Sequence, residues 1–276
     1  MRSNVEGFET RPAARINKVS RRRYDDFVIS EEALSILVNS ETHGEQKLGV
    51  TMRTKGNDSN LVLGFLFSEG IINSVDEVLG VENESDKTII VLSSESNFDP
   101  SLHCRPSIVS SACGICGRST IDDALHMHSP KLDETTKISL SSISRSLETM
   151  VSKQTLFTHT GGSHACASID INGDIKRIFE DVGRHNAMDK LVGSYVAERQ
   201  VPVNGLISFV SGRASFELVQ KSIRAGFSIM VAIGAPSSLA IDLANEHGLT
   251  LVCFAKNESI TVYTGIRRIV DQSTTS

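Results

Sequence analysis

Two cysteines three residues apart, Cys113 and Cys116, are the residues whose types and spacing point most directly to chemistry. Glycines follow both of them within residues 110–119, and glycine lets a backbone adopt positive φ and approach another group closely. A helix start signal comes next at Ser119, and free helix amides beside Arg118 would favour the thiolate form of Cys116. Because a thiolate is both a nucleophile and a metal ligand, the sequence predicts sulfur chemistry at this loop.

Two other interpretations of the cysteine pair stay open on spacing alone. A CxxC motif supplies half of the ligands of a tetrahedral zinc site. The remaining ligands would come from Cys104, His103, His126 or His128. The sequence has no second CxxC motif, so this zinc signal is weak. The other interpretation is an inert turn in which two cysteines happen to lie close together.

The composition is that of an acidic globular protein. A chain of 276 residues can bury a substantial core in one large domain or two smaller ones. The net charge of −5 and the absence of tryptophan argue against a general nucleic-acid binder. The run Arg21-Arg22-Arg23 is a local exception, which we interpret as a solvated basic surface. Five cysteines, with no secretory or membrane-spanning apolar segment, predict a cytoplasmic protein with reduced thiols.

The front part of the chain is expected to be α+β and to end with the cysteine loop. After an irregular start up to about residue 10, the predicted elements are strands at 11–19, 24–29 and 47–53, an apolar stretch through 38, a helix from 57 to Gly70 and a hairpin of 71–81 with 88–93. A Ser/Thr-rich segment at 135–146 then marks a boundary. It divides the chain into an N-terminal portion, 1–134, and a C-terminal portion, 135–276.

The C-terminal portion alternates between strands and helices. It opens with a hairpin around Asn172-Gly173, a strong turn signal. The elements that follow are helices at 186–199, 215–225 and 237–246 and strands at 206–210, 229–233, 249–255 and 260–263. This alternation predicts βαβ units and a mainly parallel sheet covered on both faces, with ligands at the carboxyl ends of its strands.

Four loops at this predicted sheet edge combine glycine with a hydroxyl group or a cation. They are residues 158–164, 180–186, 211–215 and 234–238. Glycine turns that lead into helices present free amides to phosphate, and Arg184 and Arg213 can bind phosphate bidentately. One such loop is ordinary capping, but four in succession indicate a large anionic ligand. His164 and His185 are interpreted as either phosphate donors or helix caps. Cys166 and Cys253 are predicted to be core thiols.

At these residues the sequence resembles the formate dehydrogenase accessory sulfurtransferase family, FdhD. The resemblance covers nearly the whole chain, through residues 52–58, 64–71, 113–117, 180–187, 211–213 and 235–238. The sequence departs from the family pattern at Lys55, where proline is usual, and at 59–61, where an acidic residue is common.

The resemblance implies a fold similar to that of cytidine deaminases, a three-layer α/β sandwich with a smaller α+β N-terminal portion, and a homodimer. It implies a sulfurtransferase that accepts persulfide sulfur from a cysteine desulfurase. The sulfur would pass to the molybdenum cofactor, bis-molybdopterin guanine dinucleotide, before that cofactor enters the catalytic subunit of formate dehydrogenase. The persulfide carrier would be Cys113, and Cys116 would assist.

The same resemblance implies which residues hold the cofactor. They are Phe254, Ala255, Lys256, Asn257, Glu258 and Ser259, together with Gly183, Arg184, His185, Ser211, Gly212 and Arg213. Lys256 stands where the family commonly has arginine.

Two rival functions come from other classes. A zinc-dependent deaminase needs a His or Cys with Glu two residues on, followed by Pro-Cys-x-x-Cys. Here the CxxC motif precedes His164, and Cys166 occupies the Glu position, so that chemistry is excluded. The remaining alternative is a non-catalytic, zinc-stabilised maturation chaperone of a dehydrogenase subunit.

Overall fold

The computed structural model describes residues 7–96, 98–103, 129–256 and 258–270. The cysteine loop and Asn257 lie outside the described residues. A six-stranded sheet forms the centre of the molecule, and its strand order is β13-β12-β11-β10-β8-β9. These strands are β8 (His164–Ile169), β9 (Ile175–Asp181), β10 (Ile207–Val210), β11 (Ile229–Ala232), β12 (Thr250–Lys256) and β13 (Ser259–Val262).

The sheet is mixed, so the prediction of a mainly parallel sheet was wrong. Strands β10, β11 and β12 pair in parallel, as βαβ units require. Strand β8, however, pairs antiparallel with both β9 and β10. Strand β13 follows β12 after a short turn and pairs antiparallel with it. A tight turn can only join antiparallel neighbours, which accounts for both departures.

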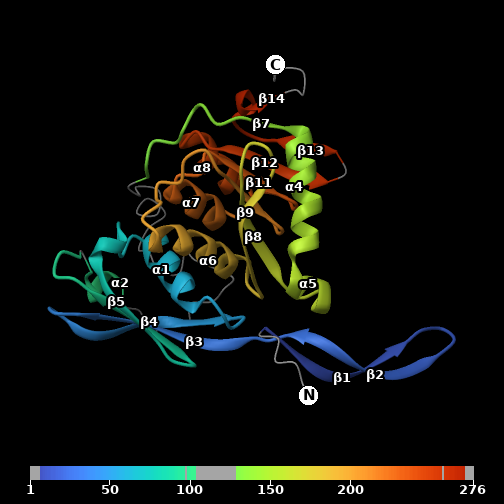
Figure 1. Cartoon of the computed structure of the whole chain (residues 1–276), viewed down its shortest axis with the longest axis horizontal. Coiled ribbons are helices and arrows are strands. Elements are labelled where there is room, and N and C mark those ends of the chain that lie inside the picture. The colour runs from blue at the N-terminus through green and yellow to red at the C-terminus, as the bar shows by residue number, and fades with distance from the viewer. Residues whose placement is uncertain (1–6, 97, 104–128, 257, 271–276) are drawn as a thin grey trace.

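Helices cover both faces of this sheet, and the predicted α/β class is confirmed (Figure 1). Helix α4 (Leu140–Lys153) contacts β9 and β12 on one face. On the other face lie α6 (Arg184–Ala197), α7 (Phe216–Ala225) and α8 (Ser238–Glu246). Strand β10 therefore buries both of its faces, with Phe209 packed in the core under α4 and Ser208 bonded to Ser222 of α7 at 2.9 Å.

A four-stranded sheet forms most of the N-terminal portion, in the order β4-β3-β6-β5. Its strands are β3 (Glu32–Ser40), β4 (Gly44–Arg53), β5 (Val78–Asn83) and β6 (Lys87–Leu92). Helix α1 (Asp58–Ser68) packs against α6, and Gly70 follows it with a positive φ of 77°, as the sequence predicted. The short elements are η1 (Val75–Glu77), α2 (Pro100–His103), β7 (Ile138–Ser139), α5 (Thr155–Thr160), η3 (Ile266–Arg268) and β14 (Ile269–Val270).

Helices α1 and α6 touch backbone to backbone at Gly64 and Gly193, a contact that we call the α1–α6 seam. A Cβ atom added at Gly64 would lie 1.9 Å from the carbonyl oxygen of Asp189, and one at Gly193 would lie 1.8 Å from that of Asn60. Any side chain at either position would force the helices apart. The two glycines therefore set the distance at which the two portions of the chain share one core.

An antiparallel ribbon of two strands, β1 (Phe8–Ile16) and β2 (Arg21–Ile29), projects from the body, and we call residues 8–29 the arm (Figure 1). At its base Phe8 stacks on His159 of α5 with ring centroids 5.2 Å apart. The irregular start predicted up to about residue 10 was wrong from Phe8 onward. Within the described residues no helix is long and apolar enough to cross a membrane.

Candidate functional site

Several loops meet at one edge of the six-stranded sheet, which we call the loop edge. Strand β8 runs antiparallel to both β9 and β10, so β9, β10, β11 and β12 all point the same way. Their carboxyl ends therefore lie at the same edge, beside the amino end of β8. The loop edge comprises residues 161–164, 181–185, 211–215, 233–238, 254–256 and 258–259.

Backbone hydrogen bonds join the loops of β10 and β11 side by side. Gly234 N–H donates to the carbonyl oxygen of Gly212 at 2.9 Å, and Ala214 N–H donates to that of Ala235 at 3.1 Å. A Cβ atom at Gly234 would lie 2.9 Å from backbone atoms of Arg213, which is too close for any other residue without a shift. Glycine is needed at position 234 because the two loops approach so closely.

Gly212 lies between His164 and Arg184. A Cβ atom built there would be 3.4 Å from Nδ1 of His164 and 3.5 Å from Cδ of Arg184. Burial, and secondarily the charge of Arg184, lower the pKa of His164 from 6.5. At neutral pH His164 is therefore an uncharged hydrogen-bonding group beside a cation.

The two arginines predicted to bind phosphate, Arg184 and Arg213, are not held by ion pairs with described residues. The Nε atom of Arg184 is buried and has no hydrogen-bond partner among the described residues. Arg213 is exposed, and no ion pair holds it within the described part of the chain. A buried donor without a partner is unfavourable, and an anion at this edge would satisfy it.

His185 joins two helix starts. Its Nε2 atom lies 3.1 Å from Oγ of Ser215 and 3.2 Å from Oε2 of Glu217. His185 stands in the first turn of α6, and Ser215 and Glu217 stand at the start of α7. These contacts fix the two loops relative to each other. The ligand-binding role predicted for His185 stays a prediction.

Asp181 is a residue of this site that sequence reasoning did not single out. Its buried carboxylate accepts hydrogen bonds from Gly183 N–H at 2.9 Å and from Thr54 N–H at 3.1 Å, and it lies 2.7 Å from Nζ of Lys190. It ties the loop before α6 to the N-terminal portion. A lysine placed among apolar residues of α6 was the available sequence signal, since a buried lysine needs an acidic partner.

The segment after β12 presents an aromatic ring at the loop edge. Phe254 has a φ of 53° and a side chain that is 40% exposed, and its N–H donates to the carbonyl oxygen of Gly234 at 3.3 Å. Positive φ is unfavourable for a residue with a large side chain, and such strain concentrates at functional sites. Of its neighbours Ala255 is buried, whereas Lys256, Glu258 and Ser259 are exposed.

The first of the four predicted loops, 158–164, begins inside a helix, which covers residues 158–160. Helix α5 occupies residues 155–160, and Gly161 ends it with a φ of 64°. Glu180 stabilises its first turn by accepting hydrogen bonds from the N–H groups of Leu156 and Phe157, both at 2.9 Å. The prediction of a loop from 158 was wrong because this capping carboxylate comes from a distant strand, which a local pattern does not reveal.

The two cysteines that the structure describes are Cys166 and Cys253, and both are buried, as predicted. Burial raises the pKa of Cys253 to about 12 and that of Cys166 further. Neither is a thiolate near neutral pH. Cys113 and Cys116 lie outside the described residues, and within the described ranges no group of three or more His, Cys, Asp or Glu side chains could hold a metal ion.

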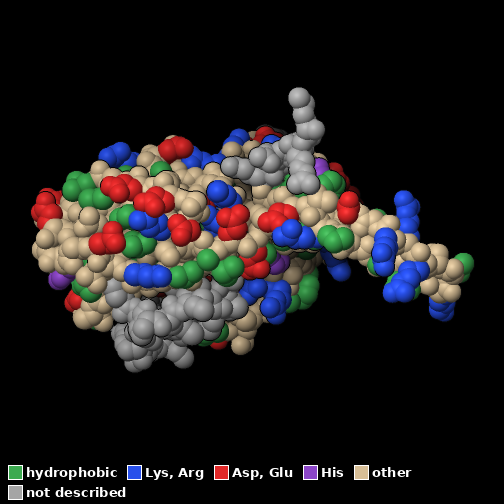
Figure 2. Space-filling view, turned by 90° about the horizontal axis from the view of Figure 1, so that it is seen from below, with side chains coloured by type: hydrophobic (Ala, Val, Ile, Leu, Met, Phe, Trp, Pro, Cys, Tyr) green, Lys and Arg blue, Asp and Glu red, His purple; other side chains and the backbone are tan. Residues whose placement is uncertain are grey.

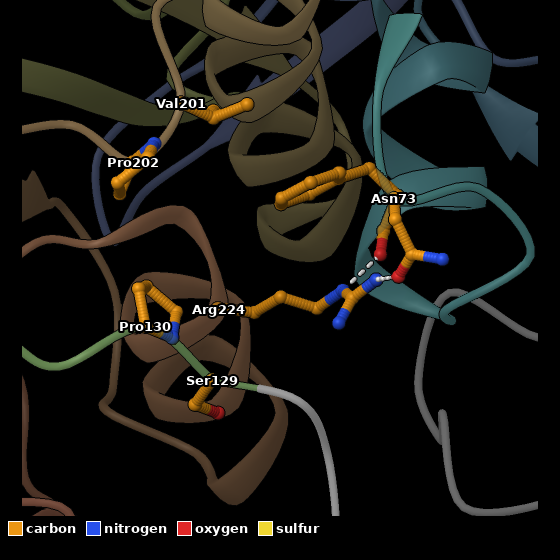
Figure 3. A pocket seen from close by; sticks show the side chains of 7 residues that line it. Asn73, Ser129, Pro130, Val201, Pro202 and Arg224 are labelled. Atoms are coloured by element: carbon orange, nitrogen blue, oxygen red, sulfur yellow. Dashed lines mark hydrogen bonds between the residues drawn. The ribbon is translucent and has the colours of Figure 1, made fainter. Parts of the chain in front are cut away.

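A cavity of about 530 Å³ lies at the other end of α7, away from the loop edge (Figure 3). Its lining includes Phe67, Asn73, Pro202 and Arg224. The guanidinium of Arg224 donates to the carbonyl oxygen of Phe67 and, at 3.0 Å, to Oδ1 of Asn73. This arginine is engaged in joining α7 to the end of α1, in contrast to Arg184.

The fold and this site define the class of protein: an α/β protein whose glycine- and arginine-rich loops share one sheet edge. The model of the FdhD/NarQ family matches residues 29–270, and the chain belongs to this family. It is 40% identical over 246 residues to "Sulfur carrier protein FdhD" of Sulfurisphaera tokodaii, covering 89% of this chain and 92% of that one. It is 37% identical over 275 residues to the protein of the same name from Thermoplasma acidophilum, covering 97% and 95%.

A solved structure shares the fold. It is a protein from Desulfotalea psychrophila described as a formate dehydrogenase accessory protein, with a TM-score of 0.78, 23% sequence identity, and coverage of 95% of this chain and 99% of that one. The predicted family resemblance is confirmed.

Proposed function

We propose that this protein is a sulfur carrier that matures a formate dehydrogenase. Cys113 would accept persulfide sulfur from a cysteine desulfurase, and the sulfur would pass to bis-molybdopterin guanine dinucleotide held at the loop edge. The names of the curated relatives support the sulfur carrier role. The family resemblance supports the desulfurase, the formate dehydrogenase and a cytoplasmic setting.

The observation that carries the cofactor part of the proposal is the Nε atom of Arg184, which has no hydrogen-bond partner among the described residues. This atom is buried at the loop edge, where the Arg184 side chain lies beside Gly212 and a Cβ atom added at Gly212 would be 3.5 Å from Cδ of Arg184. The helices α6 and α7 both begin here, and their first amides favour anions. A pyrophosphate fits this donor set, and the exposed ring of Phe254 offers a flat apolar surface to a base.

The sulfur step proposed for Cys113 is a thiol exchange. Its thiolate attacks the outer sulfur of the desulfurase persulfide, a new S–S bond forms on Cys113, and the desulfurase cysteine leaves as a thiolate. Cys116 would assist. The burial and raised pKa of Cys166 and Cys253 support placing this chemistry on the cysteine loop.

Intact mass spectrometry tests the sulfur step. We expect the protein to gain the mass of one sulfur atom when it is incubated with a cysteine desulfurase and cysteine, and to lose it on reduction. The Cys113→Ala variant should gain nothing, and Cys253→Ala is the matched control that removes a thiol elsewhere. Stoichiometric zinc on the purified protein together with no sulfur adduct would replace the proposal with the zinc-stabilised chaperone.

A further inference from the structure

The charges of the arm are divided along its length. Its outer half, residues 15–23, contains no acidic side chain and five exposed cations, which are Arg15, Lys18, Arg21, Arg22 and Arg23. The three carboxylates of the arm, those of Glu9, Asp25 and Asp26, lie in the half nearer the body, where Glu9 pairs with Arg11. Figure 2 shows the blue side chains gathered along the projecting arm. The far end of the arm therefore carries a concentrated positive charge.

The cations of the outer half lie on both faces of the ribbon. Arg15 and Arg22 are directly opposite each other, so they share one face, and like charges in that position destabilise a strand pair. Arg21 and Arg23 flank Arg22 along β2, so they point to the other face. A flat protein surface would meet only one face of the ribbon. A layer of anionic headgroups around the end of the arm would meet both.

The tip of the arm is apolar. Val19, in the turn between the two strands, is 95% exposed, and Ile16, the last residue of β1, is 63% exposed. Exposed apolar groups beside cations are the composition that binds the interface of an anionic bilayer. Single-stranded nucleic acid is bound by stacking its bases on aromatic rings, and residues 15–23 contain no aromatic side chain. The outer half of the arm therefore fits a lipid surface better than a nucleic acid.

The backbone of the tip is paired within the turn itself. Oδ1 of Asn17 accepts hydrogen bonds from the N–H groups of Val19 and Ser20, at 2.9 Å and 2.8 Å. The N–H group of Asn17 donates to the carbonyl oxygen of Ser20 at 3.0 Å. A backbone donor that leaves water without a partner is unfavourable. Because these three donors already have partners, the turn can enter a headgroup layer without leaving them unpaired.

The length of the arm keeps the rest of the molecule away from an anionic surface. Residues 8–29 contain six Lys or Arg and three Asp or Glu, so the remainder of the chain contains 22 Lys or Arg and 30 Asp or Glu. Anionic lipid repels that acidic remainder. Each strand of the arm has nine residues and is about 30 Å long, whereas the screening length in physiological salt is about 8 Å. The repulsion is therefore largely screened when only the end of the arm touches the surface (Figure 1).

We propose that the arm binds the surface of an anionic lipid bilayer. Ile16 and Val19 enter the boundary between headgroups and acyl chains, and the five cations of the outer half contact lipid phosphates on both faces of the ribbon. The contact is peripheral and reversible, and it holds the acidic body away from the bilayer. This proposal does not depend on sulfur transfer or on cofactor binding.

Co-sedimentation of the full chain with vesicles tests the contact. We expect wild type to bind vesicles of equimolar phosphatidylglycerol and phosphatidylcholine, and to bind vesicles of phosphatidylcholine alone much more weakly. The arm variant, with Arg21→Glu, Arg22→Glu and Arg23→Glu, should bind the anionic vesicles at least about tenfold more weakly than wild type, because each cation near an anionic leaflet adds to binding. A control variant with Lys131→Glu, Lys153→Glu and Arg267→Glu changes three exposed cations outside the arm, and it should bind as wild type does.

A single tryptophan can report whether the tip leaves water, since the chain contains no tryptophan. In Val19→Trp the fluorescence maximum should shift to shorter wavelength when anionic vesicles are added. Ile171→Trp is the control, because Ile171 is 50% exposed in the β8–β9 turn, outside the arm, and its emission should not move. A variant with Ile16→Asn and Val19→Asn should bind the vesicles severalfold more weakly although its charge is unchanged.

Raising the salt concentration from 0.1 to 1 M should release wild type from the vesicles, since the screening length falls from about 10 Å to about 3 Å. Thermal unfolding of all variants checks that these exposed substitutions leave the fold intact. Four results would overturn the proposal. They are no binding of wild type to anionic vesicles, equal binding to anionic and neutral vesicles, an arm variant that binds as wild type does, and an unshifted emission of vesicle-bound Val19→Trp. A wild type that binds heparin through the arm but no vesicles would assign the arm to a polyanion such as nucleic acid instead.

Discussion

The α1–α6 seam and the loop edge both border α6, and they differ in how their buried cations are partnered. Two buried lysines beside the seam are paired: Lys190 lies 2.7 Å from Asp181, the first residue of loop 181–185, and Lys221 lies 2.6 Å from Asp189. At the loop edge the buried Nε of Arg184 has no partner in the described structure. Lys190 also donates to the carbonyl oxygen of Thr54 at 2.8 Å, and Asp189 accepts from Ser68 at 3.3 Å, so the paired groups join the two portions of the chain. The unpaired Nε atom is available to a ligand. Substitutions of the paired groups and of the unpaired group should therefore separate stability from binding.

The largest expected effect is at the Asp181–Lys190 pair. Asp181→Ala removes one partner of a buried ion pair and two acceptors of backbone N–H groups, which should lower the free energy of unfolding by about 3–5 kcal/mol. Urea unfolding measures it. The control is Asp174→Ala, which breaks an exposed ion pair with Arg145 and should change the free energy by less than about 1 kcal/mol. Equal decreases in the free energy of unfolding of the two variants would show that the buried pair contributes no more to stability than the exposed pair.

The second effect is at the seam itself. Gly193→Ala places a Cβ atom 1.8 Å from the Asn60 carbonyl oxygen, so α1 and α6 must separate, and the free energy of unfolding should fall by about 3 kcal/mol. Gly80→Ala is the control, because its Cβ atom would meet nothing closer than 3.9 Å. An unchanged midpoint of urea unfolding for Gly193→Ala would contradict the backbone contact.

The third effect is a dependence of stability on pH. Burial raises the pKa of Asp189 from 3.8 to about 6, against the opposing effect of Lys221. The folded protein then binds this proton more tightly than the unfolded chain, so this group makes stability fall as pH rises from about 4 to about 6, by up to about 1.4 kcal/mol per pH unit. Comparing the pH dependence of unfolding in wild type and Asp189→Asn isolates this contribution. Parallel pH profiles would show that Asp189 does not titrate in this range.

The fourth effect is on binding at the loop edge. Arg184→Met should weaken the binding of GDP, used as a probe of the pyrophosphate end of the proposed cofactor, by about tenfold, because a charge-assisted hydrogen bond is worth roughly 1.5–3 kcal/mol. Isothermal titration calorimetry measures it. Arg224→Met removes a buried arginine at the other end of α7, and it should lower stability while leaving GDP affinity unchanged. Unchanged GDP affinity in Arg184→Met together with weaker GDP binding in Arg224→Met would contradict the roles given to the two arginines.

The smallest effect is expected at Phe254. Two substitutions there separate the cost of its positive φ from the contribution of its ring to binding. Phe254→Gly removes the unfavourable φ of 53° together with the exposed ring, whereas Phe254→Ala removes only the ring. We expect the glycine variant to be more stable than the alanine variant by about 1 kcal/mol, and both to bind GDP a fewfold more weakly. GDP affinity equal to that of wild type in both variants would remove Phe254 from the binding surface.

The elements of the C-terminal portion were predictable because their signals are local. The Asn172-Gly173 turn, the apolar strands and the helices between them all appear close to their predicted bounds. The direction of β8 and the capping of α5 by Glu180 depend on partners distant in sequence, and a periodic pattern does not contain them. Asp181 was not predicted for the same reason, because its partners are distant in sequence: Thr54 lies in the N-terminal portion and Lys190 in the C-terminal portion.

The loops of the site were predictable from their composition, but the contacts that their side chains make were not. Arg184, Gly212 and Arg213 were expected at one edge, and the structure brings their loops together there. The sequence did not show that His185 bonds to Ser215 and Glu217, or that a buried atom of Arg184 has no partner among the described residues, because both follow from side-chain packing.

The backbone contact at Gly64 and Gly193 also limits how this chain can change over evolutionary time. A side chain that meets another side chain can be accommodated when the neighbour becomes smaller. Each of these glycines meets a carbonyl oxygen, which every amino acid carries, so no second substitution can restore the space. A library randomised at both positions and selected for folded protein should return glycine at each, without a compensating pair.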